Sequence, residues 1–97
     1  MTKFGELISL EKPVLIDFYF DWEEASDSLD TLKNVAAALG DKAKVIKIDI
    51  KQNEVLADAL RVKGNPTFII YKKGEMKWRQ TGEQDANTLI GLVQQYV

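Results

Sequence analysis

The chain has 97 residues, of which 45% are hydrophobic and 29% are charged, and its formal net charge is −2. This length and apolar content predict one folded domain over 1–97 and exclude a largely disordered chain. Acids and bases are mixed along most of the chain and form no basic stripe, so we expect no nucleic-acid partner. No apolar run approaches the ~20 residues of a membrane helix, and the N-terminus has no signal-peptide pattern. We therefore expect no membrane partner and a cytoplasmic location.

Cysteine and histidine are both absent from the sequence. Without them a chain cannot form disulfides, attack a substrate through a thiol, run a Ser-His or Cys-His nucleophile, or build the usual zinc sites. We accordingly expect no catalytic residue of these classes, no metal and no cofactor.

The first part of the chain predicts a helix, a buried strand and a longer helix. Helical spacing of apolar residues indicates a helix over 3–10, which Pro13 ends. The run 14–20 is apolar apart from one acid, as in a strand buried on both faces. The next helix is expected over 23–39 and to end at Gly40. The residues expected to face the core are Phe4, Leu7 and Ile8 in the first helix and Ala25, Leu29, Leu32, Ala36 and Leu39 in the second.

The second part predicts a strand over 45–50, a short helix over 53–60, a hairpin and a last helix. The hairpin strands are expected over 67–71 and 76–81, with a turn at Lys73-Gly74. The last helix covers 85–96 and starts at Asp85 or Gln84. The residues expected to face the core are Val55, Leu56, Ala59 and Leu60 in the short helix and Leu89, Ile90, Leu92 and Val93 in the last; Trp78 is expected in a core position, on the same face as Met76 and Gln80.

The element order is therefore αβαβαββα. A strand, helix, strand unit requires a right-handed crossover and parallel pairing of its two strands. The closing hairpin is antiparallel. We predict an α/β fold with one mixed four-stranded central sheet and helices on both faces.

Four short motifs, in this order and spacing, resemble the thioredoxin family over about 4–97. They are the strand 12–19, the pair Asp21-Trp22, the turn Gly64-Asn65-Pro66-Thr67 and the hairpin 73–75, followed by Gly82. The resemblance implies a thioredoxin-like fold that lacks the family's first short strand. It also implies a cis peptide bond before Pro66.

The sequence departs from the family where Cys-x-x-Cys should follow the tryptophan. Those positions read Glu23-Glu24-Ala25-Ser26, with Glu23 at the place of the nucleophilic cysteine and Ser26 at that of the resolving one. Neither side chain can form a mixed disulfide. The chain is thus expected to be redox-inactive. Two origins remain open: a natural sequence, or an altered oxidoreductase whose native form has cysteines at 23 and 26.

Asp17 interrupts the strand that we expect to be buried. A lone buried carboxylate is costly unless it is protonated, paired or hydrated. Lys47, on the neighbouring strand, resembles a family lysine that lies near the corresponding acid. Asp17 and Lys47 are then either an acid–base pair with an unknown role or an inherited polar group that Lys47 partly neutralises.

Five acids lie between residues 21 and 30: Asp21, Glu23, Glu24, Asp27 and Asp30. Carboxylates in a first helical turn satisfy free backbone N–H groups and suit the positive end of the helix. The same acids could also form a surface that attracts a basic partner. A calcium site is disfavoured, because one helical turn rarely supplies six to eight oxygen ligands.

The leading functional hypothesis is a protein- or peptide-binding, chaperone-like module. The resemblance implies that the backbone before Pro66 pairs with extended substrates, which needs no cysteine. The candidate binding residues are Trp22, Glu23, Asn65, Pro66 and Thr67. A lower alternative is a non-thiol enzyme that uses Asp17, Glu23 or Glu24 as acid–base groups.

Overall fold

The computed structural model describes residues 3–19, 26–62, 67–82 and 84–97, and its elements follow the predicted order. A short 3-10 turn, Gly40–Lys42, follows the second helix. The helices and strands are α1 (Lys3–Ile8), β1 (Val14–Tyr19), α2 (Ser26–Leu39), β2 (Lys44–Asp49), α3 (Glu54–Ala59), β3 (Thr67–Lys72), β4 (Glu75–Thr81) and α4 (Ala86–Gln94).

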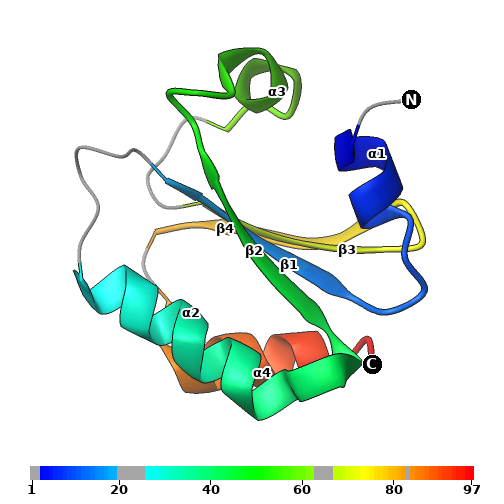
Figure 1. Ribbon diagram of the computed structural model, residues 1–97, viewed down its shortest axis with the longest axis vertical. Helices are drawn as coiled ribbons and strands as arrows, with labels where there is room; N and C mark the ends of the chain where they lie inside the picture. Colours follow the sequence, from blue (N-terminus) through cyan, green and yellow to red (C-terminus); the bar gives the residue numbers. More distant parts are fainter. Residues whose placement is uncertain (1–2, 20–25, 63–66, 83) are drawn as a thin grey trace.

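The four strands form one mixed sheet in the order β2-β1-β3-β4 (Figure 1). The predicted parallel pairing of β1 with β2 is confirmed, as is the antiparallel β3–β4 hairpin. Strand β1 pairs antiparallel with β3 on its other side. The sheet therefore has β1 and β3 at its centre and leaves β2 and β4 at its edges.

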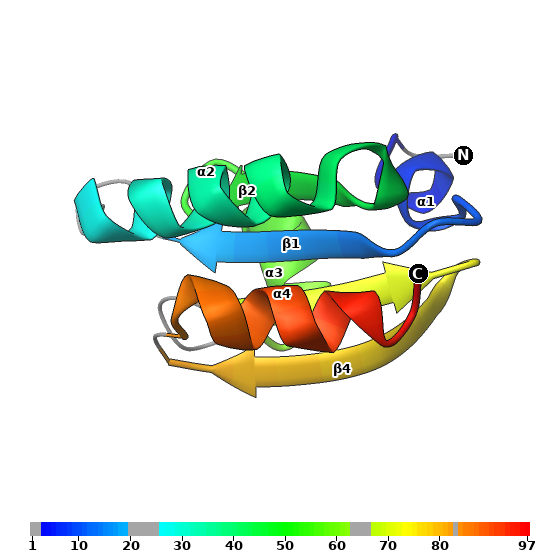
Figure 2. The same ribbon diagram turned by 90° about the horizontal axis from the view of Figure 1, so that it is seen from below.

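Helices cover both faces of the sheet, as predicted. Figure 1 shows α1 and α3 on one side of the sheet and α2 and α4 on the other, and Figure 2 shows α2 and α4 side by side. Each pair encloses its own apolar cluster, because alternate residues of β1 and β3 point to opposite faces. The buried members are Leu15, Leu32, Val35, Leu39, Ala43, Phe68, Ile70, Leu89 and Val93 under α2 and α4, and Val14, Ile16, Phe18, Ile50, Ala57, Val62, Ile69 and Tyr71 under α1 and α3.

The predicted inward face of α3 is partly wrong. Val55 is 85% exposed and Ala59 is also exposed, whereas Ala57 is buried together with the half-buried Leu56 and Leu60. Helix α3 has only six residues, and a shift of one residue turns a helix by about 100°. Two rival apolar stripes therefore fit so short a segment equally well.

The predicted inward face of α2 is also wrong at one position. Ala36 is exposed, while Val35 is buried and completes the inward stripe with Leu32 and Leu39. Ala25 lies outside the described residues, and the structure does not describe the side chain of Leu29. The predicted inward residues of α1 and α4 are confirmed, since all of them are buried or half-buried in the two clusters.

The hairpin turn lies at Lys73 and Gly74, as predicted. Lys73 and Gly74 both have positive φ angles, 54° and 83°, as a type I′ turn requires. Their amides are also used, because Lys73 N donates to Leu10 O at 2.9 Å and Gly74 N donates to Ile8 O at 2.8 Å. The turn is thereby fastened to the end of α1.

A β-bulge alters the alternation along β4. The register shifts between Ile70 and Tyr71, so that Trp78 lies opposite Ile70 but Met76 lies opposite Tyr71. Ile70 and Tyr71 face opposite sides of the sheet, and the expectation that Met76 shares a face with Trp78 is therefore wrong. The core position expected for Trp78 is confirmed, since it packs half-buried against the α2 and α4 cluster.

Asp85 begins the last helix, which settles the choice between Asp85 and Gln84. Its side chain accepts a hydrogen bond from Thr88 N at 2.7 Å, the usual N-cap contact. This hydrogen bond lowers the pKa of the Asp85 carboxyl below its usual value.

Candidate functional site

The structure describes only part of the site that the sequence predicts. Asp17, Lys47 and Thr67 lie within the described residues, and the described part of α2 begins at Ser26. The remaining candidates, and the expected cis bond at Pro66, lie outside the described residues: Trp22, Glu23, Glu24, Ala25, Asn65 and Pro66. Of the acidic group, Asp21 also lies outside them, and the side chains of Asp27 and Asp30 are not described.

Asp17 lies in the middle of β1 and is 2% exposed. It points to the same face of the sheet as Leu15, toward α2 and α4. Lys47 is its register partner on β2 and is exposed, with Nζ 5.7 Å from the centre of the Tyr19 ring. The structure thus places the acid inside and the lysine at the surface, at the same level of two paired strands.

We expect Asp17→Asn to keep or raise the melting temperature at neutral pH. An amide of nearly the same shape is neutral, so its burial costs less free energy than burial of a carboxylate. Thermal denaturation of both proteins at pH 7 measures the difference. A clear fall in melting temperature would show instead that the charge of Asp17 stabilises the fold.

Thr67 marks the start of β3 and is fully buried. Its Oγ1 lies 3.3 Å from Thr81 Oγ1 on β4. Across the sheet Thr67 is the register partner of Phe18 on β1. Phe18, near the end of β1, and Thr67, at the start of β3, are therefore neighbours at one end of the sheet. The first lies shortly before 20–25 in the chain and the second directly after 63–66.

Arg79 of β4 forms hydrogen bonds with the backbone just after α3. The sequence did not single out this residue. Its guanidinium donates to Leu60 O and to Arg61 O, just after α3. Arg61 has a positive φ of 57°, an uncommon conformation for a residue with a side chain. A basic residue on the α3 face of β4 was visible in the alternation of the strand, but its carbonyl partners were not.

Burial raises the pKa of the Tyr71 hydroxyl above its usual value, and the nearby charge of Arg79 opposes that shift. The Arg79 guanidinium therefore lies near both the end of α3 and the Tyr71 hydroxyl. Its role in the described residues is to position backbone.

The described residues contain neither a metal-binding cluster of acids nor a membrane-spanning helix. No group of three or more acidic side chains within 3–19, 26–62, 67–82 and 84–97 is arranged to hold a metal ion. Over the same ranges, no helix has the length and apolarity needed to cross a membrane.

The backbone arrangement defines a thioredoxin fold. A mutant thioredoxin from Halobacterium salinarum NRC-1 matches it with a TM-score of 0.81 and 34% identity, over 99% of this chain and 84% of that one. Chloroplastic thioredoxin z matches with a TM-score of 0.78 and 28% identity, over 93% of this chain and 82% of that one.

The sequence comparison leads to the family. The family model described as Thioredoxin matches residues 1–95. Thioredoxin Y, chloroplastic, from Oryza sativa is 38% identical over 95 residues, which are 96% of this chain but 56% of that protein. A thioredoxin-like protein of Synechocystis sp. is 31% identical over 98 residues, with 93% of its length covered. The chain thus belongs to the thioredoxin family, contains no cysteine, and spans about half the length of the chloroplastic relatives.

Proposed function

We propose that this chain is a redox-inactive thioredoxin-family domain that binds a protein or peptide. The binding surface is formed around Trp22, Glu23 and the turn Asn65-Pro66-Thr67. The observation that carries the proposal is the pairing of Phe18 with Thr67, in a family fold whose chain holds no thiol. The sheet frame around the former reaction site is retained although the reacting groups are gone.

Strand-like hydrogen bonds to a peptide use only backbone groups. Loss of both cysteines therefore removes disulfide exchange but leaves this mode of binding available. Aromatic side chains are frequent anchors at protein interfaces, and we propose that Trp22 has this role. The domain then works as an adaptor or chaperone-like module, and we infer that it is not an enzyme.

The test is an affinity pull-down from the source cells with the wild type and a Trp22→Ala, Asn65→Asp variant. We expect specific partners to be captured by the wild type and lost by the variant, because the variant removes the anchor and adds a charge beside the turn. An Asn87→Asp variant is the control for the added charge, since Asn87 is exposed on α4 and the same amide-to-carboxylate change is made there. Circular dichroism melting verifies that all three proteins are folded.

Binding of each captured protein is then measured with purified components. An affinity that is equal for the wild type and the double variant would overturn the proposal, and so would identical lists of captured proteins.

A second candidate is an altered oxidoreductase with cysteines at 23 and 26 in its native form, which the many thioredoxin relatives favour. Codons 23 and 26 of the source gene distinguish the two. A purified Glu23→Cys, Ser26→Cys variant adds a functional readout, since disulfide reduction by it would show that the rest of the site still supports exchange. The carboxylate-enzyme alternative ranks below both, because a side chain that is 2% exposed, as Asp17 is, offers a substrate little access.

The cytoplasmic location predicted from the sequence stays a prediction. The rice relative is named as chloroplastic, and we attach no compartment to the binding role.

A further inference from the structure

The outer edge of β2 is the feature that the proposed function leaves unexplained. Strand β2 is an edge strand of the sheet, and no strand of the described chain pairs with its outer side. Lys44 N donates to Pro13 O at 2.9 Å and Ile50 N donates to Tyr19 O at 2.7 Å. Residues at even numbers thus direct their backbone groups to β1, and in a parallel ladder the residues between them direct theirs to the outer edge. At Asp49 the carbonyl already accepts a hydrogen bond from Asn53 Nδ2 at 2.9 Å, so the outer edge available to a further strand is centred on residues 45 and 47.

The surface is hollowed on both faces beside this edge. On the α2 face, a cavity of about 230 Å³ is lined by Leu32, Ala36 and Val45, together with Lys33, Ile46 and Lys47. On the opposite face, a cavity of about 370 Å³ near the start of β2 is lined by Glu6, Leu7, Leu10 and Lys44. An added strand sends alternate side chains to opposite faces, and each set would meet one of these hollows.

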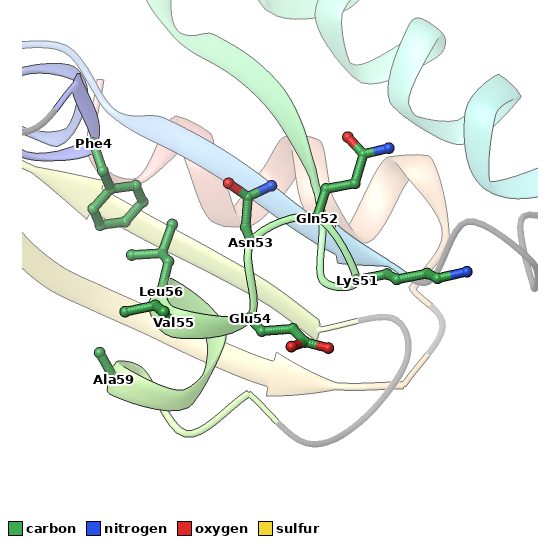
Figure 3. Close-up of a pocket in the computed structure, with 8 residues that line it drawn as sticks. All are labelled: Phe4, Lys51, Gln52, Asn53, Glu54, Val55, Leu56 and Ala59. Carbon is green, nitrogen blue, oxygen red and sulfur yellow. The ribbon is translucent and has the colours of Figure 1, made fainter.

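A third hollow lies where β2 ends, and it is the largest of the three at about 680 Å³. Figure 3 shows Phe4 from α1 and side chains of α3 around it, with Lys51 to Asn53 in the turn after β2; the α3 residues are Glu54, Val55, Leu56 and Ala59. Val55 lines this hollow and is 85% exposed. An apolar side chain beyond the end of an added strand would cover it.

The charged side chains along this edge indicate which kind of segment could bind there. Lys42, Lys44, Lys47 and Lys51 are all exposed on β2 or directly beside it. Lys33 of α2 lines the same hollow as Lys47, whereas Lys44 lines the hollow on the opposite face. Asp49 is buried, and its Oδ1 accepts from Lys51 N at 2.9 Å. The exposed acids near the two ends of β2 are Glu6 and Asp41 at its start and Glu54 beyond its end. A second copy of this edge would bring lysines against lysines, which disfavours self-pairing. An acidic extended segment meets opposite charges instead.

We propose that the outer edge of β2 docks an extended protein segment in which acidic residues alternate with apolar ones. The segment adds to the sheet as a further strand, with about six residues covering the ~20 Å of β2. Its backbone pairs with the edge, its apolar side chains enter the hollows and its carboxylates approach the lysines. Lysines on an edge strand also deter indiscriminate pairing, so the same residues admit acidic segments and reject others.

The test uses the purified chain and a synthetic, end-capped peptide of alternating Glu and Val, followed by amide NMR shifts. We expect the shifts to concentrate on residues 44–49, with Val45 among the most affected. A peptide with its central residue N-methylated has the same charge but lacks one backbone donor, and we expect it to bind about tenfold more weakly. This comparison needs no variant of the protein.

The charge requirement is tested with a Lys33→Glu, Lys44→Glu variant against a Lys73→Glu, Lys77→Glu control, which has the same net charge but is altered at the β4 end. We expect affinity to fall roughly tenfold in the first and to change little in the second. Equal binding of the methylated peptide would show charge attraction without strand pairing and would overturn the proposal. Absence of binding at millimolar peptide would overturn it too, as would concentration-dependent dimers through β2. None of these results depends on Trp22 or the Asn65 turn, so this proposal and the proposed function fail separately.

Discussion

Replacing Phe18 by alanine is expected to lower the free energy of unfolding by about 3–5 kcal/mol, the range for removing a large side chain from a packed core. Phe18 is fully buried beneath α1 and α3 and is flanked by both neighbours of β1. A domain of this size has a total stability of about 5–15 kcal/mol. The variant is therefore expected to be marginally folded at 25 °C, and urea denaturation followed by circular dichroism measures the change.

Val55→Ala is the matched control for that experiment. It also shortens an apolar side chain, but one that is 85% exposed, so we expect a change within about 0.5 kcal/mol. The pair tests the orientation of α3 directly, because the apolar pattern of the sequence predicts that Val55 is buried. A loss of stability at Val55 comparable to a core truncation would mean that the helix is turned the other way.

Arg79→Ala is expected to lower the free energy of unfolding by about 1.5–3 kcal/mol, the value of hydrogen bonds made by a charged donor. The substitution leaves Leu60 O and Arg61 O without the guanidinium that now donates to both. The loss should come from local structure after α3, and urea denaturation together with amide NMR shifts of residues 57–62 detects it.

Arg79→Lys separates the charge of this residue from its shape. Lysine keeps the charge but presents a single ammonium group instead of a planar fork. We therefore expect it to recover only part of the lost stability. Full recovery would mean that the charge alone accounts for the effect and that the two carbonyl contacts are unimportant.

The fold was predictable from the sequence because its strongest signals are local and mutually consistent. The buried run of β1, the Lys73-Gly74 turn and the apolar face of α4 each indicate one element type, and the order of elements then leaves few topologies. The parallel pairing of β1 with β2 follows from the helix between them. These features survive in the structure without change.

The wrong predictions arise where an apolar pattern is short, or where pairing with a neighbouring strand determines which face a side chain lies on. Six residues cannot distinguish a stripe through Val55 and Ala59 from one through Ala57. The bulge at Ile70 and Tyr71 moves Met76 to the other face, and nothing in β4 itself marks the extra residue. Strand alternation predicts faces only while the register is regular.

The candidate site was predictable only in part. The burial of Asp17 beside Lys47 follows from an acid in an apolar strand and from pairing with the next strand. The role of Arg79 depends on two carbonyls eighteen and nineteen positions away in the chain, which no local pattern reveals. The residues around Trp22 and Pro66 remain predictions, because they lie outside the described residues.

The two helical layers differ in a way that bears on how the molecule opens. Helices α2 and α4 have 14 and 9 residues, whereas α1 and α3 have six each. Isolated helices shorter than ~12–15 residues are marginal in water, and the six-residue α1 and α3 fall furthest below that length, so they depend most on their contacts with the sheet. We therefore expect the amide hydrogens of α1 and α3 to exchange with solvent sooner than those of β1, β3 and α2.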